Sequence, residues 1–374
     1  MKRRDLLKLA GHAALGTSLW TSCAVRKTGS ARLPVMPLSR KFAKVDVSWD
    51  RIIRTVVGLR PFRAPGFVVR GEKLERKTVI HNYGHGGAGV TLSWGTAHLA
   101  VEEALRTGAT RYAVIGCGAV GLATARLLQR KGSDVTIYAR DLPPNTTSNV
   151  AGAQWSPFSV ADPGRRTPEF ETLFARAVRI SHRYFQDLVG EHYGVRWIEN
   201  YVVTTSPEPA ELYSGQFRNL YPAVRSLTGD EHPFDSPYAH RFVTMFIEPP
   251  VYLNALLRDF VLFGGRLVVR EFKDLEAVLA LPEPVVLNCT GIGARALFGD
   301  DELVPIKGQL VVLLPQPEID YITLADNNLY MFPRRDGILL GGTFERGDWT
   351  PEVNEGERKR VVEGHMEFFR KMRA

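Results

Sequence analysis

Cysteine is scarce in this chain of 374 residues, which contains only Cys23, Cys117 and Cys289. So few thiols exclude a disulfide framework and a cysteine-rich metal site. We expect Cys117 and Cys289 to be small, buried packing residues. A hydrophobic content of 44% and a charged content of 24% are ordinary for a globular protein, and the length suffices for two domains.

Long hydrophobic runs are also missing. The apolar stretch that ends at Trp20 is short and is interrupted by Lys8 and His12, which argues against a membrane span. Residues 2–8, KRRDLLK, have the pattern of a twin-arginine leader, so we expect residues 1–30 to be an export signal and the protein to be periplasmic. Such export suits a chain that loads a tightly held cofactor before it leaves the cytoplasm. A basic, disordered N-terminus is the alternative.

Cys23 leaves a lipid anchor open, because it follows Trp20-Thr21-Ser22 at the end of the leader. Tryptophan is unfavourable three positions before a lipidated cysteine, so both a lipid-anchored and a free protein remain possible outcomes. Export and this anchor are the only membrane contacts that the sequence indicates. Residues 31–45, with Pro34 and Pro37, are predicted to be a linker.

A basic patch interleaved with aromatic residues is absent as well. The formal charge is +8, but residues 1–30 hold six basic residues and one acidic residue, so about +3 remains for the rest of the chain. This distribution argues against a nucleic-acid partner.

The centre of the chain carries a glycine-rich turn between two predicted strands, 112–115 and 134–138. The turn is a complete G-x-G-x-x-G, followed by apolar residues at helical spacing, and an acidic residue lies about 20 positions on. In such a turn the glycines permit a tight bend, let backbone approach a pyrophosphate and let helix pack on strand. The helix N-terminus offers free amides to phosphates. We therefore predict dinucleotide binding by Gly116, Cys117, Gly118, Ala119, Val120 and Gly121, with Arg140 and Asp141 at the end of the second strand.

A second glycine-rich segment, HNYGHGGAGVT at 81–91, runs into another predicted helix. Four glycines in six residues make a cradle of backbone amides at a helix N-terminus. His81 and His85 are four residues apart, but no third ligand is near in sequence, so we do not predict a metal site.

The remaining segments give a mixed α/β pattern. We expect a strand from 51 that leads into a turn at Pro61, a helix over 168–195 and mixed strands over 197–250. A helix is predicted over 251–263, and another over 355–371 at the C-terminus.

Several blocks together resemble the D-amino acid oxidase family of FAD enzymes: GLRPFR (58–63), HNYGHGGAGVTLSWG (81–95), VIGCGAVG (114–121), TTSNVAGAQW (146–155), NCTG (288–291) and LGGTFERGDW (340–349). The order differs, because in that family the G-x-G-x-x-G strand opens the chain, whereas GLRP and HNYGHGG close it. The chain therefore resembles a circularly permuted member. If so, Ala374 should lie near residues 45–50, and the C-terminal helix should lead in space to the strand at Arg51.

The resemblance implies a fold: a Rossmann-type FAD-binding domain with an interleaved mixed β-sheet substrate domain. The expected segments are a signal (1–30), a linker (31–45), the FAD-binding domain (46–155 and 251–306), the substrate domain (156–250 and 307–350) and a C-terminal helix (351–374).

The cofactor implied by the resemblance is FAD. By the family's pattern, phosphate and flavin edges are held by Thr146, Thr147, Ser148, Gly152, Ala153, Gln154, Thr290, Gly291, Gly86, Gly89 and Thr91.

The same resemblance assigns catalytic positions. Arg60 matches the arginine that pairs with the substrate carboxylate, Tyr330 adds a third bond to that carboxylate, and the Gly87 carbonyl accepts the substrate amine. The implied reaction is oxidative deamination of a D-amino acid, or a related small amine acid, by hydride transfer to flavin N5. A 2-oxo acid and ammonia result, and O2 reoxidises the flavin to give hydrogen peroxide.

Alternatives stay open at this point. The electrons could pass to a quinone or a carrier instead of O2, or the chain could be a non-catalytic FAD-binding module, although the presence of Arg60 disfavours the latter. Asp326 stands where the family often has a second tyrosine, and it either selects the substrate side chain or is a solvated turn residue. The loop before Tyr330 is also shorter than the family's active-site lid.

Overall fold

The computed structural model describes residues 42–373. These described residues belong to one compact unit, and the predicted export signal, Cys23 and most of the linker lie outside them. Within the described part, no helix is both long and apolar enough to cross a membrane.

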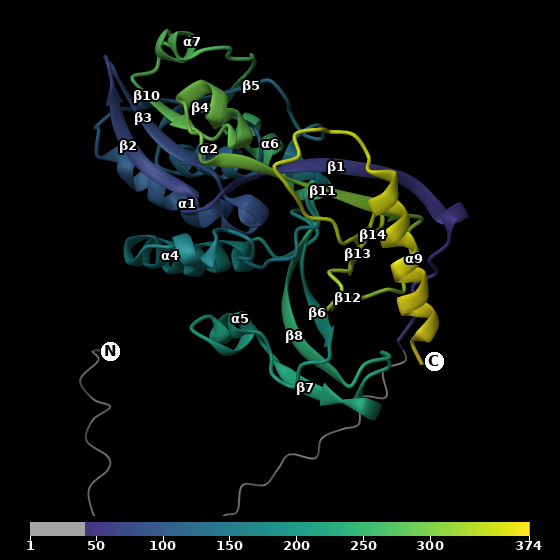
Figure 1. Ribbon diagram of the computed structural model, residues 1–374. Coiled ribbons are helices and arrows are strands. Elements are labelled where there is room, and N and C mark those ends of the chain that lie inside the picture. The colour runs from purple at the N-terminus through teal and green to yellow at the C-terminus, as the bar shows by residue number, and fades with distance from the viewer. Residues whose placement is uncertain (1–41, 374) are drawn as a thin grey trace, which may run out of the picture. The chain divides into compact units, whose positions relative to one another are not determined.

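Two sheets and nine α-helices make up the described chain (Figure 1). The helices are α1 (Gly89–Leu105), α2 (Ala119–Arg130), α3 (Thr147–Val150), α4 (Pro168–Asp187), α5 (Glu211–Ser214), α6 (Pro249–Leu262), α7 (Leu275–Leu279), α8 (Ala294–Phe298) and α9 (Glu355–Lys371). The strands are β1 (Ile52–Arg63), β2 (Val68–Leu74), β3 (Lys77–Tyr83), β4 (Arg111–Ile115), β5 (Asp134–Ala139), β6 (Val195–Thr204), β7 (Arg225–Thr228), β8 (Tyr238–Ile247), β9 (Arg266–Val269), β10 (Val285–Asn288), β11 (Leu303–Leu313), β12 (Tyr321–Ala325), β13 (Tyr330–Arg334), β14 (Gly337–Gly341) and β15 (Glu345–Arg346).

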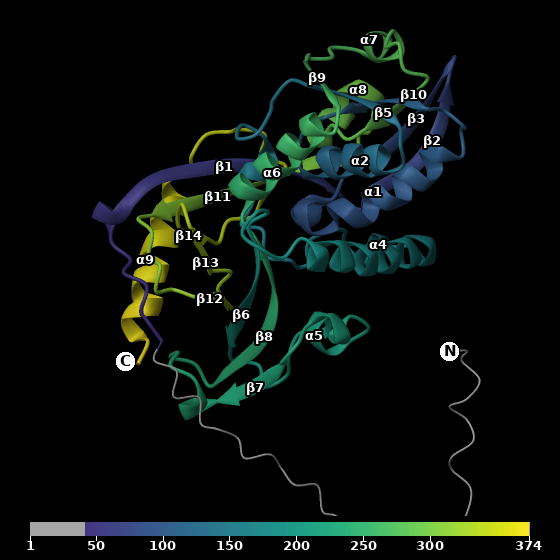
Figure 2. The ribbon, with the colours of Figure 1, turned by 180° about the vertical axis from the view of Figure 1, so that it is seen from behind.

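The first sheet has six strands in the order β2-β3-β10-β4-β5-β9. All neighbours are parallel except β2, which pairs antiparallel with β3 at one edge. Successive residues of β4 enter different clusters, since Val114 packs with α1 and α2 whereas Ala113 and Ile115 pack with α7. Figure 2 shows α1 and α2 covering one face, and α4 lies against α1. A parallel sheet covered on both faces is the predicted dinucleotide-binding architecture.

The predicted strand–turn–helix around the glycine motif is confirmed as β4, the turn and α2. Gly116 has a φ of 110°, and a Cβ there would lie 2.4 Å from the Cys289 carbonyl oxygen. A Cβ at Gly121 would lie 2.0 Å from the carbonyl oxygen of Gly116. Only glycine fits these positions, because one turn and one close helix–strand contact leave no room for a side chain.

The second sheet has nine strands, in the order β1-β11-β14-β13-β12-β6-β8-β7 with β15 on β11. It is mixed, because β12 and β6 are parallel and the other pairs are antiparallel. One face packs against α9 and the other carries Phe332, Leu310 and Leu339. The predicted mixed α/β fold class is therefore confirmed.

Two sequence predictions about β1 need correction. The chain does not turn at Pro61, because β1 continues to Arg63 and Pro61 lies opposite Pro305. Proline is tolerated there since β1 is an edge strand. β1 also belongs to the nine-stranded sheet, although residues 46–155 are assigned to the FAD-binding domain by the sequence prediction.

Two smaller differences concern local structure. The hairpin of β2 and β3 was not predicted, although it supplies the edge of the six-stranded sheet. The helix predicted over 168–195 ends at Asp187, and Gly190 and Gly194 follow with φ values of 143° and 62°. Such backbone angles are incompatible with a continuing helix.

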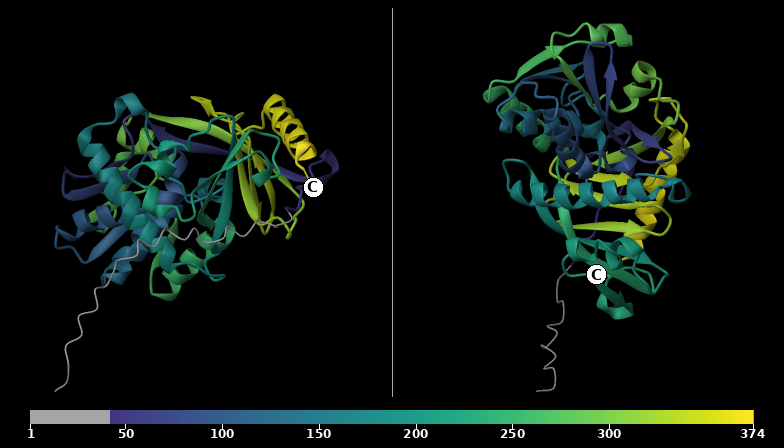
Figure 3. Two further views of the ribbon diagram at one scale, coloured as in Figure 1. Left: turned by 90° about the horizontal axis from the view of Figure 1, so that it is seen from below. Right: turned by 90° about the vertical axis from the view of Figure 1, so that its left-hand side faces the viewer.

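The two ends of the described chain lie side by side, as Figures 1 and 3 show. The Tyr321 hydroxyl donates to the Ala43 carbonyl at 2.7 Å and lies 3.8 Å from the Met372 sulfur. Val45 shares a buried cluster with Phe369. Ala374 itself lies outside the described residues, but the residues just before it are where the sequence predicts them to be.

Candidate flavin and substrate site

A cavity of about 790 Å³ joins the two sheets. Its walls include the carboxyl ends of β3, β10, β4 and β5 from the six-stranded sheet and parts of β1, β11 and β13 from the nine-stranded sheet. The carboxyl ends of parallel strands are where open α/β sheets bind ligands. One end of the cavity is therefore made by the predicted nucleotide-binding sheet and the other by the predicted substrate domain.

Backbone dominates the end of the cavity at the six-stranded sheet. The turn residues 116–120 line it together with Ser148, Thr290 and Gly291. The Ala119 amide, at the start of α2, donates to the Ser148 hydroxyl at 3.0 Å. This contact keeps the predicted phosphate ligands Ser148 and Ala119 together at the helix N-terminus, where the helix dipole favours an anion.

Arg140 and Asp141 lie at the carboxyl end of β5 and both line the cavity. The Arg140 guanidinium donates to the Asp141 carboxylate at 2.8 Å and reaches Glu271 at 3.4 Å. The adjacent Asp141 carboxylate raises the pKa of Arg140. Asp141 thus lines the cavity, but its carboxylate is already ion-paired with the Arg140 guanidinium.

Asn82, at the end of β3, was missed by the sequence analysis although it lines the same cavity. Its amide nitrogen donates to the Thr124 hydroxyl at 3.3 Å. Its carbonyl oxygen is buried and has no hydrogen-bond partner among the described residues. A buried acceptor without a donor is costly, so this atom fits a bound group that carries an N–H or O–H. Its place inside the HNYGHGG block was the available signal.

The second glycine-rich segment also reaches the cavity, and α1 begins at Gly89 as predicted. Gly87 is exposed and its amide donates to the Ser159 carbonyl at 3.1 Å. A Cβ at Gly86 would lie 2.2 Å from that same Ser159 oxygen. Thr91 accepts from the Ser156 amide at 3.2 Å, which ties α1 to the segment that carries Gly152, Ala153 and Gln154 along the cavity wall.

Neither histidine of this segment is placed as a metal ligand. His81 contacts the Glu72 carboxylate at 2.8 Å and the Asn288 amide at 3.0 Å. His85 contacts the Thr96 hydroxyl at 2.9 Å and stacks on Phe67. Burial lowers the pKa of His85 to about 3, so this ring is neutral. Across residues 42–373, no group of three or more metal-binding side chains converges.

The other end of the cavity depends on side chains from distant strands. Arg60 on β1 and Tyr330 on β13 both line it, and the Arg60 guanidinium lies 3.4 Å from the Tyr330 hydroxyl. A Cβ at Gly308 would lie 2.3 Å from Arg60, and a Cβ at Gly341 would lie 2.0 Å from the Tyr330 ring. Gly308 and Gly341, which are not among the predicted site residues, leave the space that the side chains of Arg60 and Tyr330 occupy.

Arg60 has no ion-pair partner among the described residues. The acidic residues that line the cavity, Asp141 and Glu271, lie at the carboxyl end of β5 and just after β9, where Arg140 contacts both. A half-buried guanidinium without a carboxylate is arranged to receive one from a ligand, since its planar fork makes two parallel charge-assisted hydrogen bonds.

Apolar and amide groups surround this end. The rings of Phe332 and Tyr330 lie 5.0 Å apart, and Leu310 and Leu324 also line the cavity. Gln154 lines it too, and its amide donates to the Asn200 carbonyl at 2.5 Å. Phe332, Leu310 and Leu324 were not predicted site residues, because apolar strand residues give no chemical signal in a sequence.

Asp326, for which the sequence leaves two roles open, is not among the residues that line the cavity. Its carboxylate accepts from the Thr205 amide at 2.8 Å and from the Thr205 hydroxyl at 3.3 Å, both exposed contacts. β12 and β13 are joined by a tight turn in which the Ala325 amide donates to the Leu329 carbonyl. Asp326 lies in this short turn and its contacts are exposed, which fits the solvated turn residue of the two expected roles.

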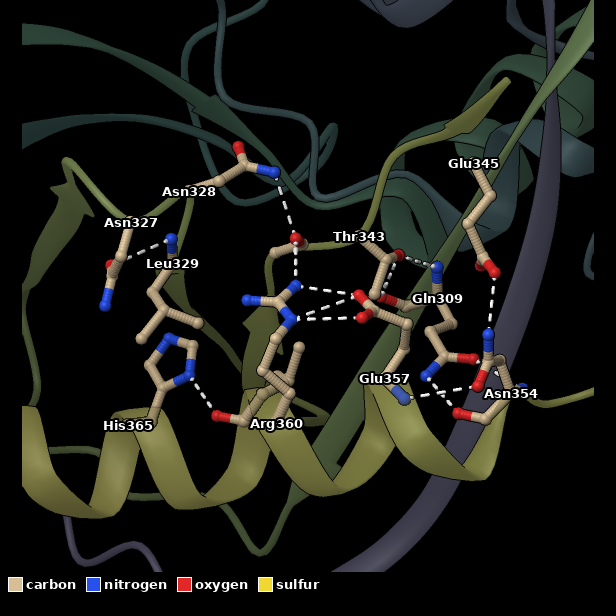
Figure 4. A network of polar contacts seen from close by, with 12 residues as sticks. Gln309, Asn327, Asn328, Leu329, Thr343, Glu345, Asn354, Glu357, Arg360 and His365 are labelled. Atoms are coloured by element: carbon tan, nitrogen blue, oxygen red, sulfur yellow. Dashed lines mark hydrogen bonds and ion pairs between the residues drawn. The ribbon is translucent and has the colours of Figure 1, made fainter.

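A polar network connects α9 to Asn328, in the turn before β13, and to the segment that follows β14 (Figure 4). Arg360 pairs with Glu357 at 2.8 Å and donates to the Gly342 carbonyl at 2.6 Å. Asn328, which lines the cavity, donates to the same carbonyl at 2.9 Å. His365 lies 3.2 Å from the Tyr330 carbonyl oxygen. The helix thus fixes the backbone on both sides of the Tyr330 side chain.

The two described cysteines behave as predicted packing residues. Cys117 and Cys289 are both buried and free. Burial raises the pKa of each thiol to about 12, so both stay protonated at neutral pH and are poor nucleophiles.

The amino-acid sequence is similar to those of known proteins. The sequence profile of the family described as FAD dependent oxidoreductase matches residues 24–103 and 111–373. A D-amino-acid oxidase from Rubrobacter xylanophilus is 33% identical over 257 residues, which cover 67% of this chain and 75% of that protein. Human D-aspartate oxidase is 29% identical over 246 residues, covering 64% of this chain and 70% of that protein.

Solved structures show the same fold at lower identity. Iminodiacetate oxidase from Chelativorans sp. BNC1 superposes with a TM-score of 0.55 at 18% identity, covering 70% of this chain and 79% of that chain. Glycine oxidase from Geobacillus kaustophilus gives a TM-score of 0.54 at 20% identity, covering 71% of this chain and 80% of that chain.

Proposed function

Because the chain belongs to the family of FAD-dependent oxidoreductases, we propose that it oxidatively deaminates a D-amino acid or a related small amine acid. The products are a 2-oxo acid and ammonia. The observation that carries this proposal is the Arg60 guanidinium, which has no ion-pair partner among the described residues and lies 3.4 Å from the Tyr330 hydroxyl, inside the cavity that the glycine turn also lines.

The cofactor is FAD, and the residues present fit it. A pyrophosphate fits the glycine turn, the Ser148 hydroxyl and the N-terminus of α2. The buried Asn82 carbonyl oxygen, which has no hydrogen-bond partner among the described residues, can accept a hydrogen bond from the cofactor. When bound, FAD accepts the hydride that leaves the substrate α carbon.

The protein's own part is positioning. Arg60 binds the substrate carboxylate with two parallel hydrogen bonds, which fix its position and its rotation, and the Tyr330 hydroxyl donates a third. The Gly87 carbonyl accepts from the substrate amine. Four hydrogen bonds from three residues to two groups on the α carbon determine which way its C–H points, and such alignment supplies much of the rate enhancement without a side-chain base.

α1 contributes an electrostatic effect. The helix begins at Gly89, on the cavity wall, and its first turn contains no acidic residue that would neutralise the amides. The partial positive charge of this helix N-terminus favours negative charge that develops in the cavity.

Anaerobic mixing of the yellow protein with a panel of D-amino acids tests the proposal. Bleaching of the flavin band by a D-amino acid, but not by its L-enantiomer, is the expected result. Rapid recovery in air with hydrogen peroxide identifies an oxidase, whereas slow recovery in air and fast recovery with a quinone identifies a dehydrogenase. If no amino acid bleaches the flavin, the deaminase proposal is wrong and a non-catalytic FAD-binding module is favoured.

We also propose that the chain is circularly permuted, with its natural ends between α9 and β1. Support comes from the order of the family blocks and from the contact of Ala43 and Met372 with the same tyrosine, Tyr321. In other members of the family, the N- and C-termini would then lie at the position of the turn between α1 and β4, residues 106–110. A variant that runs from 111 to 373, then through a short linker to 42–105, should bind FAD and keep its activity. Failure to fold with any linker length contradicts the proposal.

For the leader, we propose export by the twin-arginine route, on the strength of Arg3-Arg4 before an apolar stretch. Replacement of both arginines by lysine should retain the full-length protein in the cytoplasm. Cys23→Ser should leave export intact and should abolish membrane fractionation if Cys23 is lipidated. Periplasmic recovery of the double-lysine variant contradicts the proposed route.

A further inference from the structure

Exposed apolar side chains are frequent along the segment where α6 ends and β9 follows. These are large hydrophobic residues with 38–73% of their surface exposed: Val261, Leu262, Phe263, Val268 and Val269. All five fall within nine consecutive residues. Single exposed apolar residues are ordinary on a protein surface, but a cluster of this size marks a surface that binds something.

Within this segment, the end of α6 at Leu262 and Phe263 is held in place by contacts with α2. The Gln129 amide on α2 donates to the carbonyl oxygens of Phe260 at 2.9 Å and of Phe263 at 3.3 Å. The Arg126 guanidinium lies 4.5 Å from the centre of the Phe263 ring. α6 and α2 lie next to each other in Figure 2. The two most exposed side chains, Leu262 at 73% and Phe263 at 70%, therefore project from a fixed helix end.

Basic residues flank this helix end in sequence, and one of them, Arg266, lies 4.0 Å from the buried Glu283 carboxylate. Arg258 lies one helical turn before Leu262, Arg266 follows the Gly264-Gly265 turn, and both are exposed. Lys131, at the end of α2, is exposed as well. The single acidic residue between 258 and 270 is Asp259, which is buried and accepts from the Tyr193 hydroxyl at 2.7 Å. Exposed charge on this stretch is thus entirely cationic.

We propose that the α6–β9 tip, meaning residues 258–269, docks the protein on an anionic lipid surface. Exposed leucine and phenylalanine enter the boundary between headgroups and acyl chains, and arginine or lysine around them pairs with lipid phosphates. The cationic rim matches such a surface, whereas a second copy of the chain would bring the same cations against each other. This docking is independent of the reaction in the cavity and of the predicted export signal.

Co-sedimentation of the FAD-loaded protein, lacking residues 1–41, with lipid vesicles tests the proposal. The protein should sediment with phosphatidylcholine vesicles that contain phosphatidylglycerol, and binding should fall several-fold with phosphatidylcholine alone or at high salt. Leu262→Ser should weaken binding about tenfold, and Phe263→Ser should do the same, because each removes an apolar side chain that leaves water.

Ile53→Ser is the matched control, since Ile53 is 44% exposed on β1 and lies outside the tip. It should bind vesicles as the parent does. Absence of binding to anionic vesicles overturns the proposal, as does equal binding by Leu262→Ser and Phe263→Ser. A parent that is dimeric by light scattering, and becomes monomeric in both tip variants without any vesicle binding, assigns the surface to a second copy and also overturns it.

Discussion

The two ends of the cavity are built differently. At the six-stranded sheet the wall is mostly backbone, because Gly116 and Gly118 line the cavity without side chains and Gly121 lets α2 pack closely on the turn. At the nine-stranded sheet the functional groups are side chains, Arg60 and Tyr330, which are 270 residues apart in sequence. A backbone cradle recognises what every member of a family binds, whereas side chains determine which substrate is turned over.

Loss of a glycine at the backbone end should have the largest effect. Gly121→Ala places a Cβ 2.0 Å from the Gly116 carbonyl oxygen, so the turn and α2 must move apart. We expect the variant to be purified without flavin and to lose about 1–3 kcal/mol of stability. Flavin absorbance per protein and thermal unfolding measure both effects.

Gly164→Ala is the control for this change, since nothing lies within 4 Å of a Cβ there. It should retain flavin and stability. A fully yellow Gly121→Ala protein would show that the turn tolerates a side chain and that the backbone end is less constrained than the geometry indicates.

Acid should destabilise the protein through histidines buried in the neutral form. Burial lowers the pKa of His365 from its ordinary value of 6.5 to about 4. Between these values the unfolded chain binds more protons than the folded one, so stability falls as pH drops from about 6.5 towards 4, by up to about 3 kcal/mol. Above pH 6.5 this contribution is fully present.

His365→Gln should flatten the pH dependence of unfolding in that window, while the parent follows the expected slope. Urea unfolding at a series of pH values compares the two proteins. An unchanged slope would mean that another group, such as His85, with its pKa of about 3, accounts for the acid sensitivity.

At the side-chain end, Tyr330→Phe removes one hydrogen bond to the substrate carboxylate and keeps the ring against Phe332. A bond to a charged group contributes about 1.5–3 kcal/mol, so KM should rise about tenfold or more. Flavin content should be unchanged because the backbone end is untouched. Steady-state kinetics with the best D-amino acid measure the change, and an unaltered KM would remove Tyr330 from carboxylate binding.

The smallest expected effect comes from the contact between Arg360 on α9 and the Gly342 carbonyl, which also accepts from Asn328 just before the Tyr330 strand. Arg360→Ala frees the Gly342 carbonyl from α9, and we expect KM to rise about threefold with kcat nearly unchanged. Arg370→Ala is the matched control on the same helix, because Arg370 pairs with Glu367 in the same i,i+3 arrangement and with no other residue of the described chain. Equal kinetics for the two variants would contradict the claim that the Arg360–Gly342 contact supports substrate binding.

Sequence predicted the backbone end well because its signals are local. The strand, the glycine turn and α2 are contiguous, and each glycine of the motif has a role that chemistry dictates. The match of α9 to residues 355–371 has the same cause, since Asn354 caps the helix and basic residues end it.

The side-chain end was predicted only through family resemblance, and imperfectly. Nothing in the spacing of Arg60, Gly308, Tyr330 and Gly341 shows that they meet, because sheet pairing brings them together. The two roles left open for Asp326 could not be separated from the sequence, because its contact with Thr205 depends on how β12 pairs with β6. The continuation of β1 through Pro61 was missed since edge position cannot be read from a single strand.

The central claim is that Arg60 binds the substrate carboxylate. The most direct measurement compares a good D-amino acid with the amine that lacks only its carboxylate, in the parent and in Arg60→Ala, by the rate of anaerobic flavin bleaching. The parent should prefer the amino acid by about 100- to 1,000-fold, as two charge-assisted hydrogen bonds supply about 3–4 kcal/mol. Arg60→Ala should lose this preference and leave the slow rate with the amine unchanged. A preference that survives in Arg60→Ala would contradict the account.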